Sequence, residues 1–166
     1  HRRLSIQDLS PAGHQPMISH CERWVMIYNG ETYSNAELRP LLEARGIVFR
    51  GHSDTEVMLE AIAAWGLEEA VKKFIGMFAF ALWDRKDLNL YLVRDRLGIK
   101  PLFYSIDQQH TLWFASEVKS LLKVTNLKPN PFKVLFSSLG NLERSRYETA
   151  WDNIKQVEPG TYLKIS

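Results

Sequence analysis

The spacing of apolar residues predicts helices in the first half of the chain. Ser34 and Ser53 each stand three residues before a glutamate, the pattern of a capping box, and an apolar stripe at helical spacing follows each. Glycines end both stripes, at Gly46 and Gly66. Pro40 lies inside the first stripe and should kink that helix or delay its start. Helices are therefore predicted at residues 34–46, 53–66 and 67–74.

From residue 78 the period of the apolar positions changes to two, which is typical of strands with one buried face. Short polar stretches separate these runs in pairs, so two β-hairpins are expected. An earlier apolar run ends at Asn29-Gly30, a pair typical of a tight turn. Ser116 should cap one more short helix, whereas the pattern weakens from Lys123 onward. Strands are therefore predicted at residues 24–28, 78–83, 88–93, 102–105, 112–115 and 160–165.

The order of these elements favours an α+β fold. Helices gather early, hairpins follow one another, and there is no regular alternation of strand and helix that would indicate a parallel sheet. We therefore expect antiparallel sheet covered by helices. A chain of 166 residues has the size of one domain and buries roughly 70% of its unfolded surface, so residues 1–166 are assigned to a single domain.

Composition and charge exclude several classes of protein. The 45% hydrophobic content and five tryptophans are unlike a disordered chain. No apolar run approaches the roughly 18 residues that a membrane helix needs, so no membrane is expected as a partner. A net charge of +2 without clustered Lys and Arg gives no reason to expect a nucleic acid. The single cysteine excludes an internal disulfide and favours a cytoplasmic location. The five histidines lack metal-binding spacing, so no metal site is expected.

Three polar features could carry chemistry, and each also has a purely structural explanation. Asn29, Gly30 and Glu31 follow an apolar strand, where an Asn amide and a Gly N–H could supply the donors of an oxyanion hole. The alternative is a simple Asn-Gly turn. Asp54 at a helix N-terminus could hold a substrate amine, or could merely cap the helix. Arg3 could pair with a substrate carboxylate, or could remain solvated.

The single cysteine is not expected to be a nucleophile. His20 and Cys21 are adjacent, and neighbours on an extended segment point to opposite faces, so their side chains would not meet. Cys21 is therefore predicted to be a passive, half-buried strand residue.

Taken together, these residues and several longer motifs resemble one family. The motifs occur in order along nearly the whole chain. They are Arg3 to Ile6, Gln15-Pro16, Tyr28 to Asn35, Ser53 to Val57, Gly76 to Asp84, Arg94 to Tyr104 and Phe114 to Lys119. This series is similar to the glutaminase domain of glutamine-hydrolysing asparagine synthetase, a class II glutamine amidotransferase.

The resemblance implies a fold, an activity and a set of roles. The fold would be that of an N-terminal-nucleophile hydrolase, a four-layer αββα sandwich in which two antiparallel sheets pack face to face between helical layers. The activity would be hydrolysis of L-glutamine to glutamate and ammonia. Arg3 would bind the α-carboxylate, Glu31 and Asp54 would hold the α-amino group, and Asn29 and Gly30 would form the oxyanion hole. The backbone of Leu4, Ser5, Ile6 and Gln7 would line the pocket.

The resemblance also implies parts that the sequence does not contain. In the family the nucleophile is a cysteine at the mature first position, activated by its own α-amino group. The chain begins with His1, so we expect a fragment that lacks this cysteine and is inactive as written. A synthetase domain of the same polypeptide would follow Ser166 and use ATP and magnesium to amidate aspartate, whereas the glutaminase domain would need no cofactor.

Two alternatives stay open on the sequence. The synthetase domain chooses the nitrogen acceptor, so a relative acting on another acceptor would carry the same motifs. A non-catalytic module that binds glutamine without a thiol is also compatible with them. Sheet edges left open by the missing start could pair two chains into a homodimer.

Overall fold

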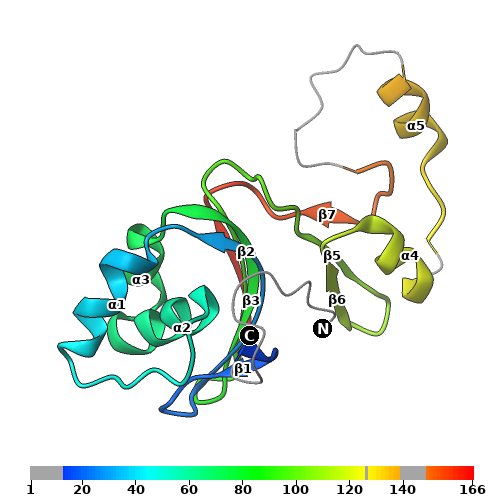
Figure 1. Cartoon of the computed structure of the whole chain (residues 1–166). Helices are drawn as coiled ribbons and strands as arrows, with labels where there is room; N and C mark the ends of the chain where they lie inside the picture. Colours follow the sequence, from blue (N-terminus) through cyan, green and yellow to red (C-terminus); the bar gives the residue numbers. More distant parts are fainter. Residues whose placement is uncertain (1–12, 126, 139–148) are drawn as a thin grey trace.

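The computed structural model describes residues 13–125, 127–138 and 149–166, which form two antiparallel sheets (Figure 1). The larger sheet has the order β1-β2-β3-β4-β8, and the smaller sheet has the order β6-β5-β7. The strands of the larger sheet are β1 (Met17–Ile18), β2 (Trp24–Thr32), β3 (Gly76–Asp84), β4 (Asn89–Arg94) and β8 (Tyr162–Ile165). Those of the smaller sheet are β5 (Phe103–Ile106), β6 (Leu112–Ala115) and β7 (Lys155–Gln156).

Three helices cover one face of the larger sheet, and the smaller sheet lies on its other side (Figure 1). These helices are α1 (Asn35–Glu43), α2 (Asp54–Trp65) and α3 (Leu67–Lys73). On the smaller sheet, α4 (Val118–Thr125) packs against β6 and β5. The helix α5 (Pro131–Ser138) follows along the chain. The α+β prediction, with two antiparallel sheets packed face to face, is therefore confirmed.

The two faces of β3 carry side chains of different size. Phe78, Phe80 and Leu82 point to the helices and belong to the main hydrophobic core. Ala79 and Ala81 alternate with them and face the smaller sheet. Because alanines leave room where phenylalanines would fill it, the space between the sheets can hold a cavity.

The two predicted capping boxes have different outcomes. The Ser53 side chain accepts a hydrogen bond from the Glu56 N–H at 3.3 Å, which confirms it as the N-cap of α2. Ser34 precedes α1 but makes no side-chain cap, because its hydroxyl instead accepts from the Ile75 N–H at 3.2 Å. Pro40 does not delay α1, which begins at Asn35.

The tight turn predicted at Asn29-Gly30 is wrong. β2 continues to Thr32, with Asn29 opposite Ala79 and Gly30 opposite Phe78 on β3. Pairing with the nine residues of β3 extends the strand through a dipeptide that by local preference would turn. The polar residues Asn29 and Glu31 are consequently presented from a strand, where their direction is fixed by the sheet.

The strand predicted at residues 160–165 is confirmed as β8, whereas α5 was missed because the apolar pattern is weak after Lys123. The start of α5 nevertheless has a readable signal. Asn130 Oδ1 accepts from the Phe132 N–H at 3.0 Å, and Pro131 is the first helical residue. Asn at the N-cap followed by Pro is a common way to begin a helix. The two-residue strands β1 and β7 were also not predicted.

Candidate active site

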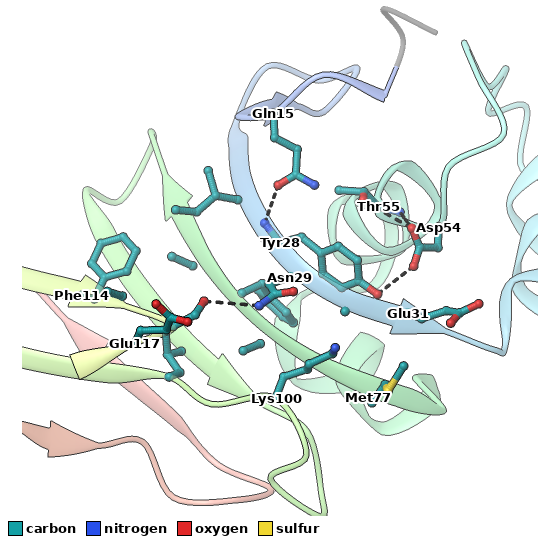
Figure 2. Close-up of a pocket in the computed structure, with 18 of the residues that line it drawn as sticks. Gln15, Tyr28, Asn29, Glu31, Asp54, Thr55, Met77, Lys100, Phe114 and Glu117 are labelled. Carbon is teal, nitrogen blue, oxygen red and sulfur yellow. Dashed lines mark hydrogen bonds between the residues drawn. The ribbon is translucent and has the colours of Figure 1, made fainter. Parts of the chain in front are cut away.

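A cavity of about 720 Å³ lies beside β2, between the two sheets (Figure 2). β1 pairs only with Val25 and Met26, so among the described residues no strand covers this edge of β2 from Ile27 onward. β2, β3 and the start of α2 line one side of the cavity. Lys100, the end of β6 and the start of α4 line the other. The cavity is large enough for a small metabolite.

A backbone donor points to the open edge of β2. The Tyr28 N–H donates to Gln15 Oε1 at 2.6 Å on this side of the strand. Backbone N–H groups two residues apart in a strand point to the same edge, so the Gly30 N–H is directed there as well. Gly30 lines the cavity, so its N–H is available there as a hydrogen-bond donor.

Residue 30 must be glycine for the strand to keep this path. A Cβ there would collide with the Met77 carbonyl oxygen and would lie 2.6 Å from Phe78 Cα. Because both obstacles are backbone atoms of β3, no side-chain rearrangement relieves the collision. The glycine therefore allows the close approach of β2 and β3 beside the cavity.

The Asn29 side chain crosses from the larger sheet to the end of the smaller one. Its Nδ2 donates to Ser116 Oγ at 3.3 Å (Figure 2). Ser116 follows β6 directly, so this contact ties the amide to the opposite wall of the cavity. The Asn29 amide and the Gly30 N–H thus line the same space.

Asp54 is the first residue of α2 and is only 6% exposed. Its Oδ2 accepts from the Tyr28 hydroxyl at 2.7 Å and from the Thr32 N–H at 3.0 Å. Its Oδ1 accepts from the Thr55 N–H at 2.8 Å. Since Ser53 is the N-cap, the simple capping explanation of Asp54 is wrong. The carboxylate instead joins β2 to α2 and faces the cavity.

The hydroxyl of Tyr28 is kept protonated by its surroundings. Burial of the side chain and the negative charge of Asp54 both raise the pKa of Tyr28 far above that of a free tyrosine. The phenol therefore remains a donor to Asp54 above the pH at which a free tyrosine ionises. Figure 2 shows the phenol pointing directly at the Asp54 carboxylate.

The structure brings four of the predicted site residues to one cavity. Asn29, Gly30, Glu31 and Asp54 all line it, although Asp54 is more than twenty positions from the others along the chain. The remaining predicted site residues, Arg3, Leu4, Ser5, Ile6 and Gln7, lie outside the described residues.

Other lining residues were in the quoted motifs but received no role from the sequence. Lys100 reaches toward the cavity, and Glu117 lies at its far wall (Figure 2). Ser116 lines the cavity as well. Gln15 and Tyr28 were likewise part of motifs. Membership of a motif was the only feature of the sequence that pointed to these residues. What each of them does depends on contacts that only the fold reveals.

The loop that carries Lys100 is held by Arg94 and Asp95. The Arg94 guanidinium donates to the carbonyl oxygens of Gly98, Lys100 and Val157 at 2.6, 2.9 and 2.7 Å. The Asp95 carboxylate accepts from the backbone N–H of Lys100 at 3.0 Å. The motif around Gly98 is therefore a structural clamp that places Lys100 at the cavity.

The cysteine lies away from the cavity, and the described residues offer neither a metal site nor a membrane-spanning helix. Cys21 is exposed in the turn between β1 and β2, so the prediction of a half-buried strand position is wrong. It does not line the cavity. Within the described ranges, no group of three or more His, Cys, Asp or Glu side chains could hold a metal ion. None of the helices described is long and apolar enough to span a bilayer.

Comparison with known proteins places this chain in a family. The whole chain, residues 1–166, matches the family described as the glutamine amidotransferase domain. It is 41% identical over 165 residues to glutamine-hydrolyzing asparagine synthetase 1 of Bacillus subtilis strain 168, covering 99% of this chain and 26% of that protein. Asparagine synthetase 3 of the same organism is 38% identical over 170 residues, with 100% and 27% covered. The chain thus spans about a quarter of the length of these relatives.

Solved structures agree on the fold. The glutamine phosphoribosylpyrophosphate amidotransferase from B. subtilis superposes with a TM-score of 0.65 over 91% of this chain and 29% of that one, at 21% identity. At this identity the likeness shows the fold alone. With the family match over its full length, the chain belongs to the class II glutamine amidotransferase domains.

Proposed function

We propose that the cavity binds L-glutamine and that the chain is the glutamine-hydrolysing part of an asparagine-synthetase-type enzyme. One observation carries the proposal. The Gly30 N–H, the Asn29 amide and the Asp54 carboxylate lie around one cavity, so that two neutral donors and an anion are available to a single ligand. Glutamine offers the matching groups, since its side-chain amide gains negative charge during hydrolysis and its α-ammonium is positive.

The donors suit the reaction at the side-chain amide. In the family a cysteine thiolate attacks the amide carbon, and the carbonyl oxygen becomes an oxyanion. Gly30 N–H and Asn29 Nδ2 would donate to this oxygen, and removing one such donor costs roughly 100- to 1,000-fold in rate. The nitrogen leaves as ammonia with a proton from the thiol. Water then hydrolyses the thioester to glutamate and regenerates the thiol.

The acidic groups suit the other end of the ligand. Asp54 and Glu31 would attract the α-ammonium, because a carboxylate and an ammonium form a charge-assisted hydrogen bond. Arg3 would pair with the α-carboxylate, and the backbone of Leu4, Ser5, Ile6 and Gln7 would complete this wall. The ligand would then be held by its head group while the amide faces Asn29.

The relatives suggest what happens to the ammonia. We propose that it passes to a synthetase domain of the same polypeptide, where ATP and magnesium activate aspartate. The glutaminase cavity itself would use neither of these cofactors. We propose that the reaction takes place in the cytoplasm.

Calorimetric titration of the chain with L-glutamine tests the site directly. We expect saturable binding, with weaker binding of L-asparagine, which is one methylene shorter. Asp54→Asn should weaken glutamine binding about tenfold to a hundredfold, since a hydrogen bond to a charged group contributes about 1.5–3 kcal/mol. Asp87→Asn is the matched control, because Asp87 is 53% exposed and lies outside the cavity. Absence of saturable binding, or an Asp54→Asn affinity equal to the wild type, would contradict the proposal.

A further inference from the structure

The Asp54 carboxylate has one accepting position left for a ligand. An ionised carboxylate offers about four lone-pair sites, two on each oxygen. The Tyr28 hydroxyl and the Thr32 N–H occupy both sites on Oδ2, at 2.7 and 3.0 Å. The Thr55 N–H occupies one site on Oδ1 at 2.8 Å. The Thr55 hydroxyl is 3.5 Å from Oδ1, beyond the ordinary 2.5–3.0 Å range of O–H···O bonds.

Tyr28 fixes which oxygen that position is on. Its side chain is 5% exposed, and its hydroxyl also contacts Thr32 Oγ1 at 3.1 Å. The phenol has one proton and an ionised carboxylate can only accept, so the phenol proton is donated to Asp54. The single proton of the Thr32 hydroxyl is shared between the phenol oxygen and Met58 Sδ, which lies 2.7 Å from Thr32 Oγ1. The phenol oxygen is thus held from two sides. Rotation of the carboxylate would break both bonds on Oδ2.

From these contacts we infer that Tyr28 is a positioning residue that makes the site selective for a ligand with a free α-amino group. This inference rests on the proposed function, in which Asp54 receives the α-ammonium. Because both lone-pair sites of Oδ2 are occupied, the α-ammonium of the ligand can bind only to Oδ1, in one orientation. Burial and the Asp54 charge raise the pKa of Tyr28, so this hydroxyl keeps its proton. Its hydrogen bond to Asp54 Oδ2 therefore persists across the working pH range.

The test compares L-glutamine with its analogue that lacks the α-amino group, 5-amino-5-oxopentanoic acid. In the wild type we expect L-glutamine to bind about a hundredfold more tightly than the analogue. Tyr28→Phe removes the hydroxyl and opens a site on Oδ2, so this preference should fall about tenfold while the affinity for the analogue changes less than about twofold. Tyr33→Phe is the matched control: Tyr33 is 58% exposed and outside the cavity, and its variant should keep the full preference.

The outcomes separate this inference from the proposed function. A wild type that binds both ligands equally overturns the assignment of the α-ammonium to Asp54, and with it the proposed function. A Tyr28→Phe protein that keeps the full preference overturns only the role of Tyr28. If Tyr28 had a purely structural role, Tyr28→Phe would weaken the binding of both ligands alike. That result would also contradict the inference.

A second measurement applies if Tyr28→Phe does not fold. The Tyr28 hydroxyl proton, buried and bound to a carboxylate, should give a slowly exchanging proton NMR signal in the wild type. Asp54→Asn should move this signal, and Asp87→Asn should leave it in place. A signal that is insensitive to Asp54→Asn would overturn the inference.

Discussion

Asp54 and Asp95 are both buried aspartates, but their carboxylates are satisfied to different extents. Asp95 is 1% exposed, and its two oxygens accept four backbone N–H groups at 3.0–3.2 Å. These come from Phe78, Leu97, Ile99 and Lys100. Asp54 is 6% exposed and accepts three bonds of ordinary length. Only Asp54 lines the cavity.

The difference shows how hydrogen-bond accounting separates a structural acid from a binding one. A carboxylate whose four accepting sites are all used by its own chain has nothing to offer a ligand. A carboxylate with a vacant accepting site that faces a cavity can still bind a cationic ligand. By this criterion Asp95 holds the loop that carries Lys100, whereas Asp54 keeps an accepting site, as the proposed function requires.

The largest effect is expected for Asp95→Asn. The amide group that replaces one oxygen donates instead of accepting, so two N–H groups that are partly or fully buried lose their partner. Each such loss costs about 1–3 kcal/mol, and we expect a decrease of about 4 kcal/mol in the free energy of unfolding, measured by urea denaturation. In Asp54→Asn the new carbonyl can still accept from Tyr28 and Thr32, so the decrease should be about 1 kcal/mol. Equal decreases in the unfolding free energy of the two variants would contradict the distinction between Asp95 and Asp54.

A smaller, pH-dependent effect is expected at Asp84, another buried carboxylate. Its side chain is 1% exposed and accepts from Arg23 Nε and Nη2 at 2.8 and 2.6 Å, as well as from the N–H groups of Lys86 and Asp87. The hydrogen bond from Arg23 lowers the pKa of Asp84 below its usual value. The stability it contributes is therefore present above the ordinary carboxyl pKa of about 4 and is lost as the pH falls through the lowered value.

Urea denaturation of Asp84→Asn at several pH values checks this sign. We expect a loss of about 2 kcal/mol at pH 7, at the low end for a charged hydrogen bond network because Arg23 is one-third exposed. The difference from the wild type should shrink below about pH 4. Asp87→Asn, at an exposed position, should differ little at any pH. A difference that grows on acidification would show that the Arg23 contact does not stabilise the ionised form.

Local patterns predicted the parts of this fold whose partners are close in sequence. The β3–β4 hairpin and the Ser53 cap depend on neighbours a few positions away, and both were predicted. The extension of β2 through Asn29 and Gly30 depends on β3, so the local preference of Asn-Gly for a turn was misleading. Whether a pattern is reliable therefore depends on how far away the deciding contact lies.

The candidate site divides in the same way. Asn29, Gly30, Glu31 and Asp54 were found because they belong to motifs. Tyr28 belongs to one of these motifs but was given no role, because its hydrogen-bond partner Asp54 lies 26 positions away in α2. Asp95 was missed as a structural centre, since one of its donors is the Phe78 N–H, 17 positions away on β3. No periodicity or composition predicts which atoms of such residues meet.

The smallest effect is expected for Thr55→Val, which tests whether the vacant site on Asp54 is truly vacant. This change removes the hydroxyl 3.5 Å from Oδ1 and keeps the Thr55 N–H that binds the same oxygen. If that hydroxyl is too distant to occupy the site, the glutamine affinity should stay within about threefold and the unfolding free energy within about 1 kcal/mol. Calorimetry and urea denaturation measure the two quantities. A tenfold gain in affinity would show that the hydroxyl competes with the ligand for Oδ1, and then Asp54 would be as closed as Asp95.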